Sequence, residues 1–167
     1  ELATEGSVAG IRLETSKLQT ANFVVTQITA TWEPNADGET IPIEFSRASA
    51  DFEQKGFPAR SIIADKPNRK SGWAVSPQTG RPHSLTLSLA DATHDRPGRL
   101  QIVISHDSVH PRHLLDHFHI ATSSSENVEA WNAIPDSIAR LVETPPERWS
   151  DADSKRAAEL VLAQRPV

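Results

Sequence analysis

The chain has 167 residues, which is long enough for one domain with a substantial core. Hydrophobic residues make up 37% and charged residues 23%, a balance that indicates a globular rather than a disordered protein. The net charge of −5 argues against a nucleic-acid partner, and no apolar run approaches the roughly 20 residues of a membrane span. The sequence contains neither Cys nor Met, so thiol chemistry is excluded, and we expect an excised part of a longer protein.

In chain order, alternation of apolar and polar residues predicts at least five strands joined by Pro- and Gly-rich loops. The predicted strands span residues 22–32, 40–52, 83–92, 99–107 and 114–124. The residues expected on the inner faces are Ile41, Ile43, Phe45, Leu85, Leu87, Leu89, Leu100, Ile102 and Ile104. Ser84, Thr86 and Ser88 are expected on the opposite face of their strand. This pattern predicts an all-β fold, an antiparallel β-sandwich of the jelly-roll kind.

The C-terminal part changes to helical periodicity. Residues 135–143 are predicted to form one helix and residues 150–164 a second, with Ser150 as its N-cap and acidic residues in its first turn. We therefore expect a β-sandwich over residues 1–130. Residues 131–167 are expected to be a short helical extension, or a linker to the next domain of the parent protein.

Several motifs resemble a known family. The segments concerned are "NFVVTQI" (Asn22–Ile28), Ala48–Pro58, "GWAVSPQTGRPH" (Gly72–His83), and more loosely Leu115–Ala121 and Ile134–Ile138. Together they resemble the discoidin-like, galactose-binding-like domain of planctomycete multidomain proteins that also carry a cytochrome c-like domain. The resemblance covers roughly residues 10–165. It implies a jelly-roll fold, carbohydrate as a ligand, and a periplasmic or extracellular parent protein.

The sequence departs from the family at two points. The Asp-Gly turn of the family is Asp65-Lys66 here, and two arginines of the family are replaced by His117 and His119. The resemblance also implies a structural calcium near this turn, for which Asp65, Asn68 and Ser71 could supply oxygen ligands. The alternative is an ordinary turn in which an Asx side chain bonds to the backbone beside Pro67.

The tryptophans invite two interpretations. An exposed Trp can stack on a sugar ring, whereas a buried Trp holds the loops above it in place. In the family pattern, the residue equivalent to Trp73 packs beneath the loops, so we expect Trp73 in the core, with "SPQTGRPH" presented above it. Trp32, at the end of its strand, is expected in the core or at its rim.

The ligand is predicted to bind where three loops converge at one end of the sandwich: Phe52–Pro58, Ser76–His83 and Asp107–His113. Amide and imidazole groups both donate and accept hydrogen bonds, which suits hydroxyl-rich ligands, and an Arg adds a fixed positive charge. The predicted contact residues are Gln54, Phe57, Gln78, His83, Arg112 and His113. The alternative for Gln78 and His83 is that they satisfy buried backbone groups of their own loop.

Five histidines lie between His106 and His119, which raises the possibility of a zinc site. Pro111 interrupts helical spacing, and no carboxylate is clearly placed to complete a set, so a solvated polar face is the favoured interpretation.

No catalytic motif is present. The resemblance implies a carbohydrate ligand, and we therefore predict a non-catalytic module that binds polysaccharide. The alternative is a structural or docking domain that positions the cytochrome-like and partner domains of the same parent chain.

Overall fold

The structure is a computed structural model, and it describes residues 2–4, 6–34, 39–93, 97–125, 128 and 146–163. The chain divides into two compact units, residues 1–132 and 133–167, and each is described by itself. The helix predicted over residues 135–143 lies outside the described residues.

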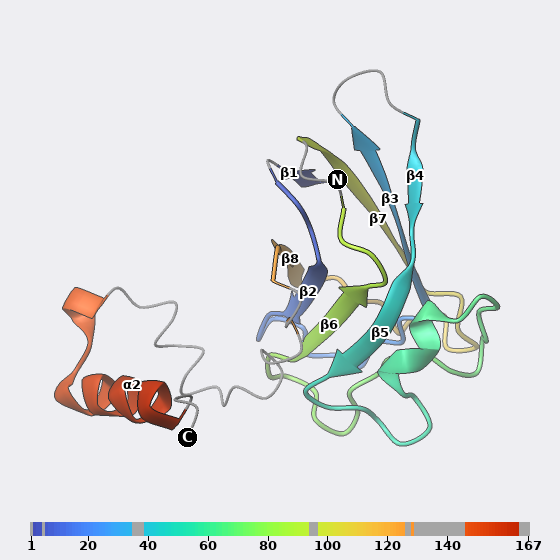
Figure 1. Cartoon of the computed structure of the whole chain (residues 1–167). Coiled ribbons are helices and arrows are strands. Elements are labelled where there is room, and N and C mark those ends of the chain that lie inside the picture. Colours follow the sequence, from blue (N-terminus) through green and yellow to red (C-terminus); the bar gives the residue numbers. More distant parts are fainter. Residues whose placement is uncertain are drawn as a thin grey trace. The chain divides into compact units, whose positions relative to one another are not determined.

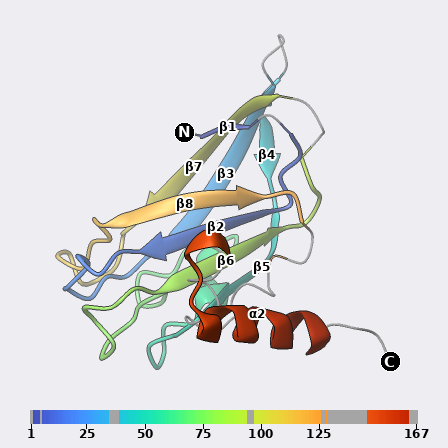
Figure 2. The same cartoon turned by 90° about the vertical axis from the view of Figure 1, so that its left-hand side faces the viewer.

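The first unit is a sandwich of two four-stranded antiparallel sheets (Figure 1), which confirms the predicted all-β sandwich. Its jelly-roll identity stays a prediction. The first sheet has the order β1 (Leu2–Thr4), β7 (Gly98–Ser105), β3 (Gln27–Pro34) and β4 (Ile41–Ile43). The second has the order β5 (Phe45–Ala50), β6 (Ser84–Leu89), β2 (Gly10–Thr15) and β8 (Phe118–Ser123), and Figure 2 shows this sheet facing the viewer.

The core lies between the sheets and follows the alternation of the strands. On β3, the side chains of Ile28, Ala30 and Trp32 are buried, because inward and outward positions alternate along a strand. Leu85, Leu87 and Leu89 of β6 are buried as predicted, and so is Leu100 of β7. Thr86, expected on the outer face of β6, is also buried.

The predicted strand over residues 40–52 is wrong in one respect, because the chain changes sheets inside it. β4 pairs with β3, whereas β5 pairs with β6, and only Glu44 separates the two strands. Ile41, Ile43 and Phe45 therefore do not share the face of one strand. A two-residue period runs unbroken across such a corner, so the sequence pattern does not reveal it.

Three long connections leave the same end of the sandwich, because neighbouring strands are antiparallel. They are residues 16–26 between β2 and β3, residues 51–83 between β5 and β6, and residues 106–117 between β7 and β8. We call these three segments together the loop end; it lies at the lower end of the sandwich in Figure 1. The 51–83 connection contains the short 3-10 helix η1 (Ala59–Ile63).

The second unit contains the 3-10 helix η3 (Pro146–Arg148) and the helix α2 (Asp151–Ala163). Ser150 caps α2 as predicted. Its Oγ accepts a hydrogen bond from the Asp153 N–H at 3.2 Å, and Asp153 Oδ2 accepts one from the Ser150 N–H at 3.0 Å. Within the described residues, no helix is long and apolar enough to cross a membrane.

Candidate functional site

Trp73 lies beneath the loop end and is fully buried, as predicted. Its indole Nε1–H donates to the Phe52 carbonyl at 3.0 Å, and its ring meets the Phe23 ring edge-on, with centroids 4.8 Å apart. Its backbone forms a bridge with Val25 through bonds of 2.8 and 3.0 Å. Trp73 therefore joins two of the three segments of the loop end, residues 16–26 and 51–83, and offers no surface on which a sugar could stack.

Gln54, a predicted ligand contact, is engaged within the protein. Its Oε1 accepts from Asn22 Nδ2 at 3.0 Å and from the Ser76 N–H at 3.2 Å. Asn22 Oδ1 in turn accepts from the N–H groups of Val75 and Ser76. Together these two amides hold the loops around residues 54 and 76 against the β2–β3 connection. The Phe57 N–H bonds to the Gln54 carbonyl, and the Phe57 side chain is half-buried.

His83 is also engaged within the protein, and it is only 2% exposed. Its Nδ1 lies 2.9 Å from Asp51 Oδ2, and its Nε2 lies 2.6 Å from the Gln78 carbonyl oxygen. Asp51 Oδ1 accepts from the Ser84 N–H, so the carboxylate bonds on both of its oxygens. The structure thus supports the alternative interpretation, in which His83 satisfies groups of its own loop.

Both groups that face the imidazole of His83 are acceptors. Burial by itself lowers the pKa of His83, and so does the nearby charge of Arg81. The hydrogen bonds to Asp51 and to the Gln78 carbonyl, together with the negative charge of Asp51, raise the pKa by more than these two effects lower it. The pKa of His83 is therefore raised above its ordinary value of 6.5. The imidazolium is the form that can donate to both acceptors at once.

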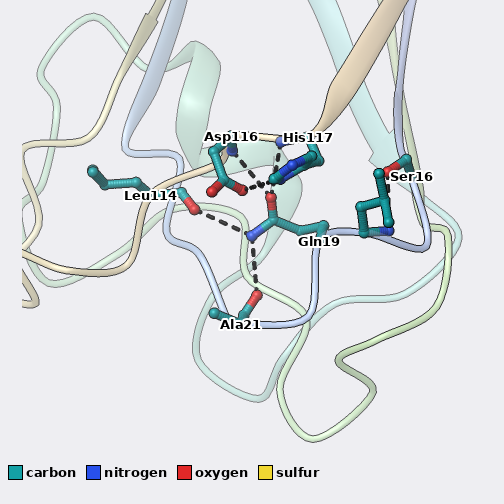
Figure 3. A network of polar contacts seen from close by, with 7 residues as sticks. Ser16, Gln19, Ala21, Leu114, Asp116 and His117 are labelled. Atoms are coloured by element: carbon teal, nitrogen blue, oxygen red, sulfur yellow. Dashed lines mark hydrogen bonds and ion pairs between the residues drawn. The ribbon is translucent and has the colours of Figure 1, made fainter.

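Gln19, which the sequence did not single out, joins the β2–β3 connection to residues 114–117 (Figure 3). Its Nε2 donates to the carbonyls of Ala21 and Leu114, at 3.1 and 3.2 Å. Its Oε1 accepts from the N–H groups of Asp116 and His117, at 3.0 and 3.2 Å. Gln19 is 3% exposed, so all of this bonding takes place out of water.

The third predicted loop, Asp107–His113, leaves the same end but bonds to different neighbours. The Val24 N–H donates to the His113 carbonyl at 3.0 Å, and the Val109 N–H donates to the Arg69 carbonyl at 3.1 Å. The rings of His110 and His113 stack with centroids 5.0 Å apart, and Arg112 is exposed. Only the other two predicted loops are joined directly, through Gln54 and Ser76.

Two predicted contacts keep unused hydrogen-bonding capacity. Gln78 Oε1 and His113 Nδ1 are buried and have no hydrogen-bond partner among the described residues. Each belongs to a half-buried residue of the loop end.

The three residues proposed as calcium ligands are not arranged as a cation site in this structure. Asn68 Oδ1 accepts the Lys70 N–H at 2.9 Å, which is the Asx turn expected as the alternative, and Asp65 is exposed. His117 pairs with Asp116, and His119 pairs with Glu14, whose other carboxylate oxygen pairs with Arg12. Among the described residues, no group of three or more His, Cys, Asp or Glu could hold a metal ion. Bound calcium stays a prediction.

The loop end differs from the rest of the chain in charge. It contains eight of the 17 Lys and Arg residues but five of the 22 Asp and Glu residues, a net charge of +3, which leaves −8 for the remainder. All eight cations are exposed, and none forms an ion pair with another described residue. They are Lys17, Lys55, Arg60, Lys66, Arg69, Lys70, Arg81 and Arg112. Of these, only Arg112 was predicted as a ligand contact, although a count of charges between the predicted strands reveals the asymmetry.

By its fold, then, the first unit is an antiparallel β-sandwich with a cationic loop end. A scan against protein-family models, a search of curated proteins and a search of solved structures each gave no match.

Proposed function

We propose that the β-sandwich is a non-catalytic module that binds an acidic polysaccharide at its loop end. The observation that carries this proposal is the net charge of +3 on loops whose eight Lys and Arg side chains are all exposed, on a chain of net charge −5. Surface cations without an ion-pair partner attract a polyanion more strongly than cations that are already paired with carboxylates. The sugar class rests on the resemblance of the sequence motifs, which also suggests an exported parent protein.

An acidic glycan fits the loop end better than a neutral one. Neutral sugars are commonly held by stacking on exposed aromatic rings, but Trp32 and Trp73 are at most 2% exposed. Arg81 and Arg112 can instead bind carboxylate or sulfate groups with two parallel hydrogen bonds. Gln78 and His113 offer additional polar atoms for hydroxyl groups.

The internal bonds of Gln19, Asn22, Gln54 and His83 support binding indirectly. They fix the loops to one another before any ligand arrives, so less conformational entropy is lost on binding. The predicted contacts Gln54 and His83 thus position the loops in this proposal, and the exposed cations make the contacts.

The proposal assigns no reaction to the His83–Asp51 pair, although a His–Asp pair is a common general base. The Nε2 of His83 faces a backbone carbonyl at 2.6 Å, and the residue is 2% exposed. A substrate proton could reach this nitrogen only if the loop opened.

Calorimetry with three glycans tests the proposal: heparin, polygalacturonate and neutral dextran. We expect binding to one or both acidic glycans that weakens with added salt, and none to dextran. Arg81→Gln/Arg112→Gln should weaken binding roughly 2- to 30-fold, from about 0.2–1 kcal/mol for each exposed charge contact. Arg148→Gln/Lys155→Gln removes two exposed cations of the second unit and should leave the affinity unchanged.

Two outcomes would overturn the proposal. One is the absence of binding to either acidic glycan at low salt. The other is equal affinity for double-stranded DNA of the same charge density, which would show a polyanion surface without a preference for carbohydrate.

A further inference from the structure

The two sheets have four edge strands, and three of them are protected against pairing with another chain. β1 has three residues, and β4 has three residues with Pro42 at its centre. β5 is bulged between Phe45 and Arg47, carries the charge of Arg47, and packs beside η1. Short length, Pro, bulges, charges and a covering segment are the devices by which natural sheets block their edges.

β8 has none of these devices. It pairs with β2 in unbroken register from Phe118 to Ser123, and these six residues include no Pro, Lys, Arg, Asp or Glu. Figure 2 shows β8 at the outer side of its sheet, next to β2 alone, and no described strand lies on its other side. An open, regular and uncharged edge of this kind is a template for a further strand.

The backbone groups that face outward from β8 follow from its bonds to β2. The Ser16 N–H donates to the His117 carbonyl, and the Ala9 N–H donates to the Ser123 carbonyl, so the odd-numbered residues bond toward β2. In a strand the direction alternates, so Phe118, Ile120 and Thr122 present their N–H and C=O groups at the free edge. The same three residues share the core-facing side, opposite Thr15, Leu13 and Ile11.

We propose that β8 pairs antiparallel with β8 of a second copy of this chain, about a two-fold axis at Ile120. In this register Ile120 lies opposite the partner's Ile120, and Phe118 lies opposite the partner's Thr122. Each of these pairs exchanges two N–H···O bonds, because every residue involved has its free backbone groups at the edge. The two four-stranded sheets become one continuous sheet of eight strands.

The side chains match this register. Phe118 is 40% exposed and Ile120 is half-buried, although both are on the core-facing side. Across the axis, the Ile120 pair and the Phe118–Thr122 pairs cover each other, so apolar surface is removed from water. On the outer face, His119 lies opposite the partner's Ala121.

Charge favours a second copy over an unrelated strand. A two-fold axis places like residues near one another, which is tolerated only where the strand carries no fixed charge, as β8 does not. Antiparallel pairing also places the two loop ends at opposite extremes of the dimer. Each loop end, of net charge +3, then lies toward the opposite end of its partner, where Glu39, Glu44 and Asp91 are found together with the Glu33–Arg99 pair.

Thr122→Pro tests the interface in the whole chain. Thr122 is exposed and its N–H points away from β2, so Pro removes an edge donor and places its ring against the partner without breaking a bond to β2. The control is Thr122→Val, which keeps the N–H and the branched shape. Sedimentation equilibrium should give two chains for the native protein and for Thr122→Val, and one chain for Thr122→Pro. The melting temperature of Thr122→Pro should equal that of the native protein diluted until it is a single chain.

Hydrogen exchange on the native protein tests the same register without any substitution. We expect the amides of Phe118, Ile120 and Thr122 to exchange more slowly as protein concentration rises, while those of His119 and Ala121 are protected at every concentration by β2. A native protein that remains a single chain at millimolar concentration would refute the proposal. So would a dimer that persists in Thr122→Pro, or edge amides whose protection does not depend on concentration.

Discussion

Replacing Asp51 by Asn should abolish the part of the pH dependence of stability that comes from His83. In the native protein His83 faces two acceptors, the Asp51 carboxylate and the Gln78 carbonyl, so only the imidazolium satisfies both. An Asn side chain can still accept the Ser84 N–H through its oxygen and can turn its NH₂ group toward His83 Nδ1. Neutral His83 would then accept at Nδ1 and donate at Nε2, with both bonds retained.

The sign of the effect follows from the raised pKa of His83. A group whose pKa is higher in the folded state stabilises the fold fully below its unfolded value, near 6.5, and this contribution disappears as pH rises through the folded value. Deprotonation leaves the Nε2 lone pair against the Gln78 carbonyl at 2.6 Å, which is the loss of one buried hydrogen bond. Such a loss costs roughly 1–3 kcal/mol, or about 3–10 °C in melting temperature for a domain of this size.

Urea unfolding at pH values from 5 to 9 measures this effect, with NMR titration of the His83 ring as a site-specific readout. The six other histidines are present in both proteins, so the difference between native protein and Asp51→Asn isolates the contribution of His83. We expect the native protein to lose stability relative to the variant as pH rises. Identical pH profiles for the two proteins, or a native His83 that titrates below 6.5, would show that the two acceptors do not hold the proton.

Three further substitutions test how the loop end is fixed. Trp73→Ala should cost about 3–5 kcal/mol in urea unfolding, because it empties a fully buried aromatic site; near-native stability would contradict the burial. Gln19→Ala leaves four backbone groups without their partner and should cost roughly 2–4 kcal/mol, whereas Thr20→Ala next to it, on an exposed side chain, should change stability by less than about 0.5 kcal/mol. Gly72→Ala should prevent folding or cost more than about 3 kcal/mol, since its Cβ would fall on the Val25 carbonyl oxygen and the residue has a φ of +149°. Gly56→Ala should cost only about 1–2 kcal/mol, because Gly56 has a φ of +85° but open space around it. Equal losses for the two glycine variants would show that the contact with Val25 is not tight.

Strands with strong alternation were predictable, and the failures have definite physical causes. β6 and β7 were predicted within a few residues of their observed ends. β2 was missed although Ile11 and Leu13 alternate with Arg12 and Glu14, and β1 is too short for any period to show. The predicted strand over residues 22–32 begins at Gln27, because the residues before it belong to the loop end and bridge to Trp73.

Within the candidate site, burial was easier to predict than polar contacts. The burial of Trp73 was predicted from the resemblance of its motif to the family pattern, and the structure confirms it. Gln54 was predicted as a ligand contact because its loop was expected near the other loops, and His83 because imidazole suits hydroxyl groups. Each instead bonds to a residue 32 positions away, Asn22 and Asp51 respectively. Such pairings depend on which loops meet in the folded chain, and neither residue type nor local spacing encodes that.

The strand order has a consequence for how this part of the chain acquires its structure during synthesis. One sheet contains β1, β3, β4 and β7, and the other contains β2, β5, β6 and β8. The chain therefore crosses repeatedly from one sheet to the other. A nascent chain that ends at Thr93 lacks β7, which is the only described partner of β1 and the longer partner of β3. Non-local pairing of this kind makes folding slow, roughly milliseconds to seconds. We therefore expect the first sheet to form only after the ribosome has released the residues of β7.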